Sequence, residues 1–435
     1  MRFPRVVYFF LLIVAVSCNN KVHRLVHKDF TKHAVLSQNF SGLAIYDPGR
    51  REMLYEENAD KYFTPASNTK IYTFFTSLEV LGDSIPGLKY ITRGDSLIFW
   101  GTGDPSLLNP NMEQTSDRVF DFLKSRPEKL FYANKPYSDP SFGPGWAWDD
   151  YNDYYSAERS PFPVFGNVVS GVKEKGGLNV SLTPSFFTTV FEEGIYEESA
   201  YTKRDKNDNR FIYAFKEEDE WNEQVPFIWS SELAIELLSD TLHKEIAHFP
   251  FSQEFYDESV QTVYSIPTDT LLKRMMLPSD NFIAEQLLLV CHDALTDTLA
   301  SSEMIDIALD SILNDLPDRP RWVDGSGLSR YNLFTPRNTV YILNKLYQKL
   351  PEERIFEMFP AGGKSGTLKN YYKADVPYIY AKTGSFSNNH SLSGYLITKK
   401  GKRLIFSFMH NNYMVSSRLI KQVMEEVLIK LRDNY

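Results

Sequence analysis

The spacing of apolar residues predicts helices in several separate parts of the chain. After residue 67, apolar side chains recur at helical intervals, so a buried helix is expected to begin near Ser67. The same spacing returns at 232–238 and 280–288. The last apolar positions fall on one face of a closing amphipathic helix: Val415, Leu419, Ile420, Val423, Met424, Val427, Leu428 and Leu431. Mixed charges on its other face favour packing on a sheet over lying on a membrane.

Strand-like runs separate these helices. Residues 41–46 and 52–55, with a turn at 47–50, predict a hairpin that leads into the Ser67 helix. Three further strands are expected at 376–385, 391–398 and 403–410. From about residue 83 the pattern changes to short β-like runs separated by turns. Nothing in residues 83–250 suggests a catalytic site within this segment itself. We therefore expect a discontinuous domain formed by 37–82 and 251–435, interrupted by a strand-rich insertion at 83–250.

Composition narrows the possible functions. A chain of 435 residues with 43% hydrophobic and 14% aromatic residues can bury a large core. Its formal net charge is −9, and Lys and Arg form no long runs. Nucleic acid is therefore not expected as a partner.

The N-terminus resembles a targeting signal. Arg2 and Arg5 precede an apolar stretch, residues 6–14, that is too short to span a bilayer comfortably. It ends in A-V-S-C at 15–18, which resembles the lipobox of bacterial lipoprotein signal peptides. We expect residues 1–17 to be removed, Cys18 to be lipidated and 18–36 to form a polar tether. A plain secretory peptide cut after Ser17 is the alternative.

Few residues suggest redox or metal chemistry. Lipidation of Cys18 would leave Cys291, in an apolar helical stretch, without a disulfide partner. The histidine pairs at 23/27 and 243/248 lack the H-E-x-x-H pattern. We expect neither a metal site nor an organic cofactor.

Ser67 and Lys70 are the first candidates for catalysis. Residues three apart on a helix lie one above the other, so the Lys70 amine can reach the Ser67 hydroxyl. A serine needs a base to become a nucleophile, and a lysine kept neutral by burial or by a nearby cation can serve. The alternative is that Ser67 only caps the helix and Lys70 faces solvent.

Two further motifs follow in a definite order. S-D-N at 279–281 lies at the head of a predicted helix, and K-T-G at 382–384 lies in a predicted strand. Each is weak alone, but together with S-N-T-K at 67–70 they resemble the serine acyl-transferase signature of penicillin-binding proteins and serine β-lactamases. A second K-S-G, at 364–366, lies in a glycine-rich loop, so Lys382 is the better candidate for the third motif.

Other segments narrow the resemblance to class C penicillin-binding proteins, the D-alanyl-D-alanine carboxypeptidases and endopeptidases. They are G-T-G-D-P-S-L at 101–107, the aromatic cluster at 146–155, D-G-S-G-L-S-R-Y-N at 324–332 and G-T-L at 366–368. The resemblance spans most of residues 40–412. It implies an α+β (α/β) architecture: a penicillin-binding transpeptidase-like, β-lactamase-like domain of antiparallel sheet covered by helices. The strand-rich domain would be inserted after the nucleophile helix.

The resemblance also implies catalytic roles. Ser67 would attack the peptide carbonyl between two D-alanines to form an acyl-enzyme. Lys70 would take the serine proton, helped to stay neutral by the positive charge of Lys382. Ser279 would relay a proton to the leaving amine.

Substrate contacts are implied as well. Asn281 would hydrogen-bond the substrate backbone, and Lys382 with Thr383 would hold the terminal carboxylate. The backbone N–H groups of Ser67 and Ser385 would form an oxyanion hole. Gly384 would leave room for substrate along the strand.

The insertion is expected to make the enzyme selective for one side chain of the substrate. By resemblance, Asp150 would bind the free amine of a diaminopimelate side chain, with Tyr155 as an aromatic wall and Arg330 nearby. For Asp150 the alternative is a surface turn acid. Ser387, three places after Gly384, replaces a longer polar residue of some family members and leaves the side-chain preference open.

The sequence thus predicts a serine-type D-Ala-D-Ala carboxypeptidase or endopeptidase of the cell envelope. It would be lipid-anchored in the periplasm, would act on peptidoglycan stem peptides and would be inhibited covalently by β-lactams. One rival is a β-lactamase or esterase on the same core, and another is a catalytically silent cell-wall-binding lipoprotein.

Overall fold

The computed structural model describes residues 21–28, 30, 33–112, 117–177, 179–196 and 198–435. One antiparallel five-stranded sheet organises it, in the order β14-β15-β16-β1-β2. Its strands are β1 (Phe40–Asp47), β2 (Glu52–Glu57), β14 (Ile379–Phe386), β15 (Asn389–Ile397) and β16 (Arg403–Asn411). The predicted hairpin and the three late strands are thereby confirmed, with ends shifted by a few residues.

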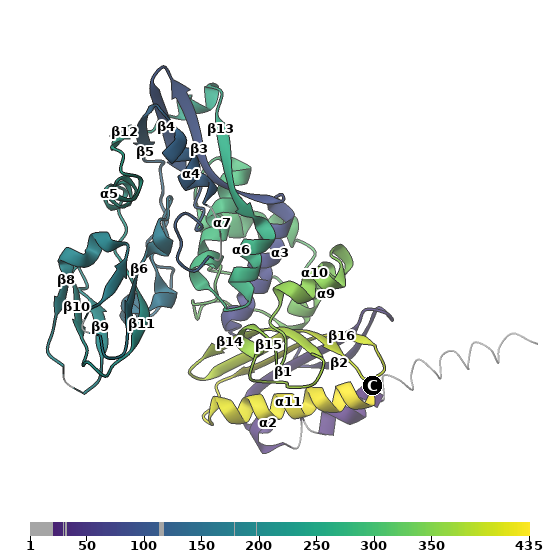
Figure 1. Ribbon diagram of the computed structural model, residues 1–435. Helices are drawn as coiled ribbons and strands as arrows, with labels where there is room; N and C mark the ends of the chain where they lie inside the picture. The colour runs from purple at the N-terminus through teal and green to yellow at the C-terminus, as the bar shows by residue number, and fades with distance from the viewer. Residues whose placement is uncertain (1–20, 29, 31–32, 113–116, 178, 197) are drawn as a thin grey trace, which may run out of the picture.

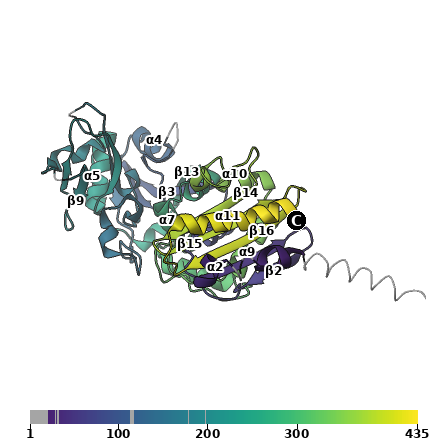
Figure 2. The same ribbon diagram turned by 90° about the horizontal axis from the view of Figure 1, so that it is seen from below.

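Helices cover both faces of this sheet, so its central strands β15 and β16 are buried almost throughout. On one face, α9 (Pro336–Lys349) contacts the sheet and joins a helical core. The rest of that core is α3 (Lys70–Val80), α6 (Thr268–Met276), α7 (Asn281–Thr296), α8 (Ser301–Ile307) and α10 (Glu352–Met358). On the other face α11 (Ser417–Asn434) lies across the strands, as Figure 2 shows. Its predicted apolar stripe is buried there, so packing on the sheet is confirmed.

The prediction of a polar tether at 18–36 is wrong for the residues of this segment that the structure describes. Residues 21–28 are helical, and α2 (Ala34–Gln38) follows. Val22 and Val26 are fully buried, one helical turn apart, in the same apolar cluster as α11 and the sheet. The apolar surface buried by these side chains stabilises the segment against the domain. The predicted signal peptide and Cys18 lie outside the described residues.

The insertion forms two regions that extend away from the catalytic sheet, on the far side of the helical core (Figure 1). The first is a five-stranded sheet, β12-β5-β4-β3-β13, and the second holds two three-stranded sheets, β11-β6-β7 and β8-β10-β9. Helices α4 (Arg118–Ser125) and α5 (Ser231–Leu242) pack with them. The strands are β3 (Ser84–Arg93), β4 (Ser96–Gly101), β5 (Lys129–Ala133), β6 (Val168–Lys173), β7 (Ser181–Thr183), β8 (Phe191–Glu193), β9 (Tyr201–Arg204), β10 (Phe211–Ala214), β11 (Trp221–Pro226), β12 (Ile246–Phe249) and β13 (Gln261–Pro267).

Strand pairing moves one predicted boundary. The sequence places the end of the insertion at residue 250, yet β13 pairs antiparallel with β3, the first strand after the nucleophile helix. The insertion therefore leaves and rejoins the catalytic domain through two neighbouring strands, and it ends at Pro267. The two strands that connect the insertion to the catalytic domain thus lie side by side.

A buried charge cluster joins the insertion to the helical core. Asp293 of α7 is fully buried and pairs with Lys135 and with Lys89 of β3. Cys291, on the same helix, is also buried, as predicted, and is not in a disulfide. No helix in the described part of the chain is long and apolar enough to cross a bilayer.

Candidate active site

Ser67 lies on a single turn of 3₁₀ helix, Ala66–Thr69, that continues directly into α3. The predicted helix is confirmed, but its first turn is tighter than an α-helix. Ala66 has a φ of +48°, in the left-handed region that residues with a side chain rarely adopt. This local strain lies immediately before the candidate nucleophile.

Two glycines allow neighbouring segments to approach the backbone of the nucleophile turn closely. A Cβ on Gly384 of β14 would come within 2.4 Å of the Pro65 carbonyl oxygen and 2.9 Å of the Ser67 nitrogen. A Cβ on Gly327 would come within 2.0 Å of the Ala66 carbonyl oxygen. Gly384 is thus needed for the close approach of the strand to the Ser67 turn. Gly384 also lines the cleft, and its predicted role of making room for substrate stays a prediction.

Lys70 is fully buried behind Ser67, so the alternative of a solvent-facing lysine is excluded. Its Nζ lies 3.0 Å from Ser67 Oγ, 2.7 Å from Asn281 Oδ1 and 2.8 Å from the Ser326 carbonyl oxygen. Burial lowers the pKa of Lys70 to about 8, against the opposing effect of nearby carboxylates, chiefly that of Glu285. The expected effect of the Lys382 charge on Lys70 stays a prediction.

Glu285 supports this arrangement from within α7. Its fully buried Oε1 accepts a 2.7 Å hydrogen bond from the backbone N–H of Ser326. Its Oε2 lies 3.7 Å from the guanidinium of Arg159, which comes from the insertion. Burial raises the pKa of Glu285 to about 7. Sequence analysis missed Glu285, although an acid inside an apolar helical run is a signal that could have identified it.

The K-T-G motif contacts the S-D-N motif in this site. Lys382 Nζ donates to Ser279 Oγ at 2.7 Å, and burial followed by repulsion from Lys70 lowers the pKa of Lys382 well below its usual value. Ser279 has a φ of +70°, another strained position beside the reacting groups. Lys364, the alternative lysine, is exposed. The structure therefore brings Ser67, Lys70, Ser279, Asn281 and Lys382 together: the two serines and Asn281 line the cleft, and the two lysines are buried beside them.

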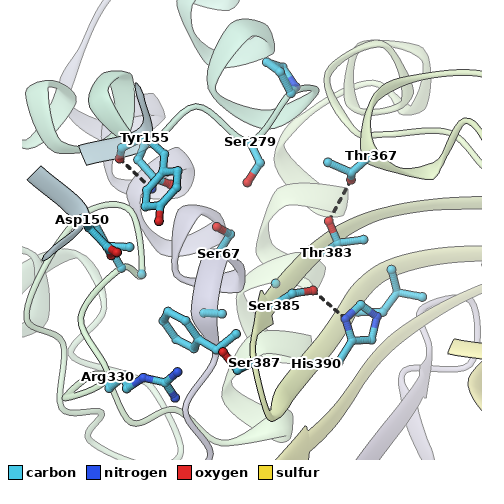
Figure 3. A pocket seen from close by; sticks show the side chains of 18 of the residues that line it. Ser67, Asp150, Tyr155, Ser279, Arg330, Thr367, Thr383, Ser385, Ser387 and His390 are labelled. Atoms are coloured by element: carbon cyan, nitrogen blue, oxygen red, sulfur yellow. Dashed lines mark hydrogen bonds between the residues drawn. The ribbon is translucent and has the colours of Figure 1, made fainter. Parts of the chain in front are cut away.

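A cleft of about 920 Å³ opens at Ser67. Figure 3 shows Asp150, Tyr155 and Arg330 on one side of Ser67, with Thr383 and Ser385 on the other. All the predicted substrate-binding residues line this cleft: Thr383, Gly384, Ser385, Asp150, Tyr155, Arg330 and Ser387. Their individual roles, including the oxyanion hole at Ser385, stay predictions.

The side of the cleft that carries Asp150 has more polar residues and hydrogen bonds than predicted. Asp150 is half-buried, and burial raises its pKa. The hydroxyl of Tyr155 donates to Asp153 at 3.0 Å, while its backbone carbonyl accepts from Asn281 at 3.0 Å. Asp149 also lines the cleft and was not predicted. The insertion thus contributes directly to the wall around Asn281.

Further residues line the cleft on the Thr383 side, and none of them was assigned a role from the sequence. Thr367 exchanges a 2.8 Å hydrogen bond with Thr383, and His390 lies 2.8 Å from Ser385 Oγ (Figure 3). Tyr371 and Lys421 complete this end of the lining. Thr367 belongs to the G-T-L segment already noted in the sequence, whereas His390, Tyr371 and Lys421 reach the cleft only through the folding of the chain.

Known proteins resemble this chain over most of its length. A penicillin-sensitive carboxypeptidase A from Dictyostelium discoideum is 24% identical over 452 residues, which cover 89% of this chain and 85% of that protein. The D-alanyl-D-alanine carboxypeptidase DacB of Haemophilus influenzae is 31% identical over 156 residues. That shorter match spans 34% of this chain and a third (33%) of the Haemophilus protein.

Solved structures confirm the predicted fold class. Penicillin-binding protein 4 (dacB) of Haemophilus influenzae superposes with a TM-score of 0.71 at 19% identity, covering 95% of this chain and 98% of that one. A penicillin G-acylated predatory endopeptidase from Bdellovibrio bacteriovorus superposes with a TM-score of 0.52 at 15% identity, covering 90% and 93%. The family profile of Peptidase_S13 matches residues 25–212 and 241–431. As the three motifs predicted, this chain belongs to the D-Ala-D-Ala carboxypeptidase 3 (S13) family.

Proposed function

We propose that this protein hydrolyses D-Ala-D-Ala peptides of peptidoglycan through an acyl-enzyme on Ser67. The observation that carries the proposal is the buried Lys70 amine, 3.0 Å from Ser67 Oγ and with its pKa lowered to about 8. A base with a pKa near the working pH combines a useful neutral fraction with effective proton transfer. No metal or organic cofactor is part of the proposal.

Acylation follows from the contacts around Ser67. Neutral Lys70 takes the hydroxyl proton as Ser67 Oγ bonds to the carbonyl carbon of the penultimate D-alanine. The tetrahedral intermediate collapses when the C–N bond breaks. The leaving amine takes a proton from Ser279, which regains one from Lys382, 2.7 Å away. Lys70 then passes the proton that it took from Ser67 to Lys382, so both lysines return to their starting protonation before deacylation. The products are an ester on Ser67 and free D-alanine.

Deacylation uses the same groups with water as the nucleophile. Lys70 accepts a proton from water as its oxygen bonds to the ester carbon, and the C–Oγ bond then breaks. The proton returns to Ser67 Oγ, which restores the resting state. The shortened peptide leaves with a new carboxylate.

Fluorescent penicillin tests the acylation step. We expect covalent labelling of the wild-type protein at Ser67, located by mass spectrometry of the labelled peptide, and none in Ser67→Ala. The support is the S13 membership of this chain and its similarity to two solved structures, one complexed with a β-lactam and one acylated by penicillin G. Ser106→Ala, a buried serine outside the cleft, is a control that should still label.

Turnover is tested with a purified pentapeptide ending in D-Ala-D-Ala. Release of D-alanine, absent in Ser67→Ala, supports the proposal. Stable labelling without peptide turnover would instead favour a silent cell-wall-binding protein. Rapid hydrolysis of the bound penicillin, with no peptide turnover, would favour a β-lactamase.

We also propose that the protein is held in the bacterial envelope by a lipid on Cys18. The support is the A-V-S-C ending of the N-terminal apolar stretch. Metabolic labelling with a palmitate analogue should mark the wild-type protein and not Cys18→Ser. Labelling of both would remove Cys18 as the attachment site, and release of unlabelled wild type would favour cleavage after Ser17.

A further inference from the structure

Arg159 is a buried cation at the contact between the insertion and the helical core. It belongs to the same segment of the insertion as Asp150 and Tyr155, but its side chain is only 2% exposed. The guanidinium donates to the Ser301 hydroxyl of α8 at 2.8 Å and to the Pro140 carbonyl oxygen at 3.0 Å. These hydrogen bonds fix the position of the charge where the two parts of the chain meet.

Two carboxylates compensate this buried charge. Arg159 Nη1 lies 3.5 Å from Asp139 Oδ2, within the insertion, and 3.7 Å from Glu285 Oε2 on α7. Asp139 Oδ2 also accepts a 2.9 Å hydrogen bond from the backbone N–H of Ser301. Glu285 Oε2, in contrast, accepts no hydrogen bond from any residue that the structure describes. The ion pair with Arg159 is therefore the contact that offsets the cost of burying a charge on Glu285.

The other oxygen of Glu285 leads to the proposed base. Glu285 Oε1 accepts a 2.7 Å hydrogen bond from the backbone N–H of Ser326, and the carbonyl oxygen of Ser326 accepts from Lys70 Nζ at 2.8 Å. One carboxylate and one backbone unit thus connect Arg159 to Lys70. If Glu285 moved, Ser326 would move with it, and Lys70 would lose one of its acceptors.

Trp146 makes a second connection between the same two parts of the chain. The Arg159 guanidinium carbon lies 5.8 Å from the centre of the Trp146 ring, over its face. The indole N–H of Trp146 donates to Asp324 Oδ2 at 2.9 Å, and Asp324 Oδ1 accepts from the backbone N–H of Gly327 at 2.8 Å. The insertion therefore also holds the loop that approaches the nucleophile turn through Gly327.

We infer that Arg159 is a positioning residue through which the insertion supports the catalytic base: it holds the Glu285 carboxylate, which holds the Ser326 backbone that Lys70 contacts. The inference rests on the proposed function, because it requires Lys70 to act as the base. Asp150 and Tyr155 lie on the same segment as Arg159. The part of the insertion that lines the cleft thus also completes the surroundings of the base.

The charge of Arg159 has a defined effect on Lys70. Burial, followed by repulsion from Asp324, raises the pKa of Glu285, and Arg159 opposes this rise. Without Arg159, Glu285 would be neutral in more molecules, and a neutral Glu285 does not raise the pKa of Lys70. Removing Arg159 should therefore lower the pKa of Lys70. The other charged or titratable groups around these residues stay unchanged in the variants below: Asp139, Asp280, Asp324, Tyr137 and Glu158.

The rate of penicillin acylation, measured against pH, tests the inference. For Arg159→Met we expect the midpoint of the rise in rate to move down by about half a pH unit. Arg159→Lys keeps the charge and should keep the wild-type midpoint. In a Glu285→Gln background, Arg159→Met should cause no further shift, because the carboxylate on which Arg159 acts is gone. A merely structural role would reduce the amount of labelled protein and leave the midpoint unchanged.

Arg210→Met is the control, since it removes an exposed arginine of the insertion and should leave the midpoint unchanged. If Arg159→Met does not fold, the double variant should fold and label, because it lacks the uncompensated Glu285 carboxylate. An unlabelled double variant would overturn the inference. An unchanged or raised midpoint in Arg159→Met, or an equal shift with and without Glu285, would overturn it too. A wild type that neither reacts with penicillin nor turns over peptide would instead overturn the proposed function.

Discussion

Glu285 and Ser326 are joined by a 2.7 Å hydrogen bond from the Ser326 backbone N–H to the Glu285 carboxylate. The carbonyl of the same Ser326 accepts a hydrogen bond from Lys70 at 2.8 Å. A buried acid therefore positions the backbone that in turn holds the proposed base. The same acid raises the pKa of Lys70 through its charge.

Glu285→Gln separates these two effects. The amide oxygen can still accept from Ser326, but the negative charge is gone, so the pKa of Lys70 should fall further. We expect the midpoint of the rise in penicillin acylation rate with pH to move down by about one pH unit. Glu285→Ala should instead slow acylation and lower the urea midpoint, because it also removes the hydrogen bond and leaves a cavity.

The exposed acid Glu236 of α5 provides the control, since Glu236→Gln should leave the pH profile unchanged. An upward shift or an unchanged midpoint in Glu285→Gln would show that its charge does not act on Lys70.

The wild-type pH dependence follows from the pKa of Lys70. Because the neutral amine is the base and its pKa is about 8, the neutral fraction grows as pH rises through that value. Acylation by a penicillin should therefore accelerate between about pH 6 and pH 9 and level off above about pH 9. Stopped-flow measurement of the acylation rate gives the profile. A rate that falls over this range would assign the proton to another group.

Gly384→Ala tests the contact between β14 and the nucleophile turn. The added methyl would overlap the Pro65 carbonyl, so the strand must move away from Ser67. A displacement of about 1 Å in a catalytic site can cost about a hundredfold in rate, and we expect a loss of that order in acylation. Gly82→Ala is the matched control, since a methyl there meets no atom within 4 Å. Equal acylation rates in both variants would contradict the assignment.

Asp150→Asn tests amine recognition by the insertion. Removing the charge should lower kcat/KM on a diaminopimelate pentapeptide about fivefold, the value of one partly exposed ion pair. A diacyl D-Ala-D-Ala peptide without the free amine should be affected less. Asp149→Asn, which changes the neighbouring exposed acid of the lining, distinguishes the two candidates. Equal losses on both peptides would remove Asp150 from substrate recognition.

Asp293→Asn tests the connection between the insertion and the helical core. It leaves Lys135, which is 2% exposed, without its carboxylate and weakens the pairing of Lys89. Breaking one partner of a buried pair should lower the free energy of unfolding by about 3 kcal/mol, seen as a lower urea midpoint. Asp315→Asn breaks an exposed pair with Lys345 and should cost under about 1 kcal/mol. Equal shifts would mean that the cluster adds no special stability.

Local patterns predicted much of the catalytic domain because its signals lie close together in the sequence. Ser67 and Lys70 share one turn, and Lys382 follows residues typical of a strand. The choice of Lys382 over Lys364 could be made from those flanking residues alone. The buried stripe of α11 likewise follows from its helical spacing.

Features that depend on distant partners were not predictable in this way. Pairing of β13 with β3 is a long-range choice, so the end of the insertion was misplaced. Val22 and Val26 were overlooked because a short polar helix gains its stability from the sheet it packs on. Glu285 is conspicuous in the sequence as an acid within an apolar helical run, but its contacts with Ser326 and Arg159 could be known only from the folded chain.

The pairing of β1 with β16 has a consequence for how this protein is made. The ribosome makes residues 40–47 long before residues 403–411, so β1 cannot pair with β16 until the whole insertion has been synthesised. The sheet behind the Ser67 turn is therefore completed only after residue 411 has been made. A prematurely shortened product that lacks the final strands would leave the Ser67 turn without a complete sheet behind it.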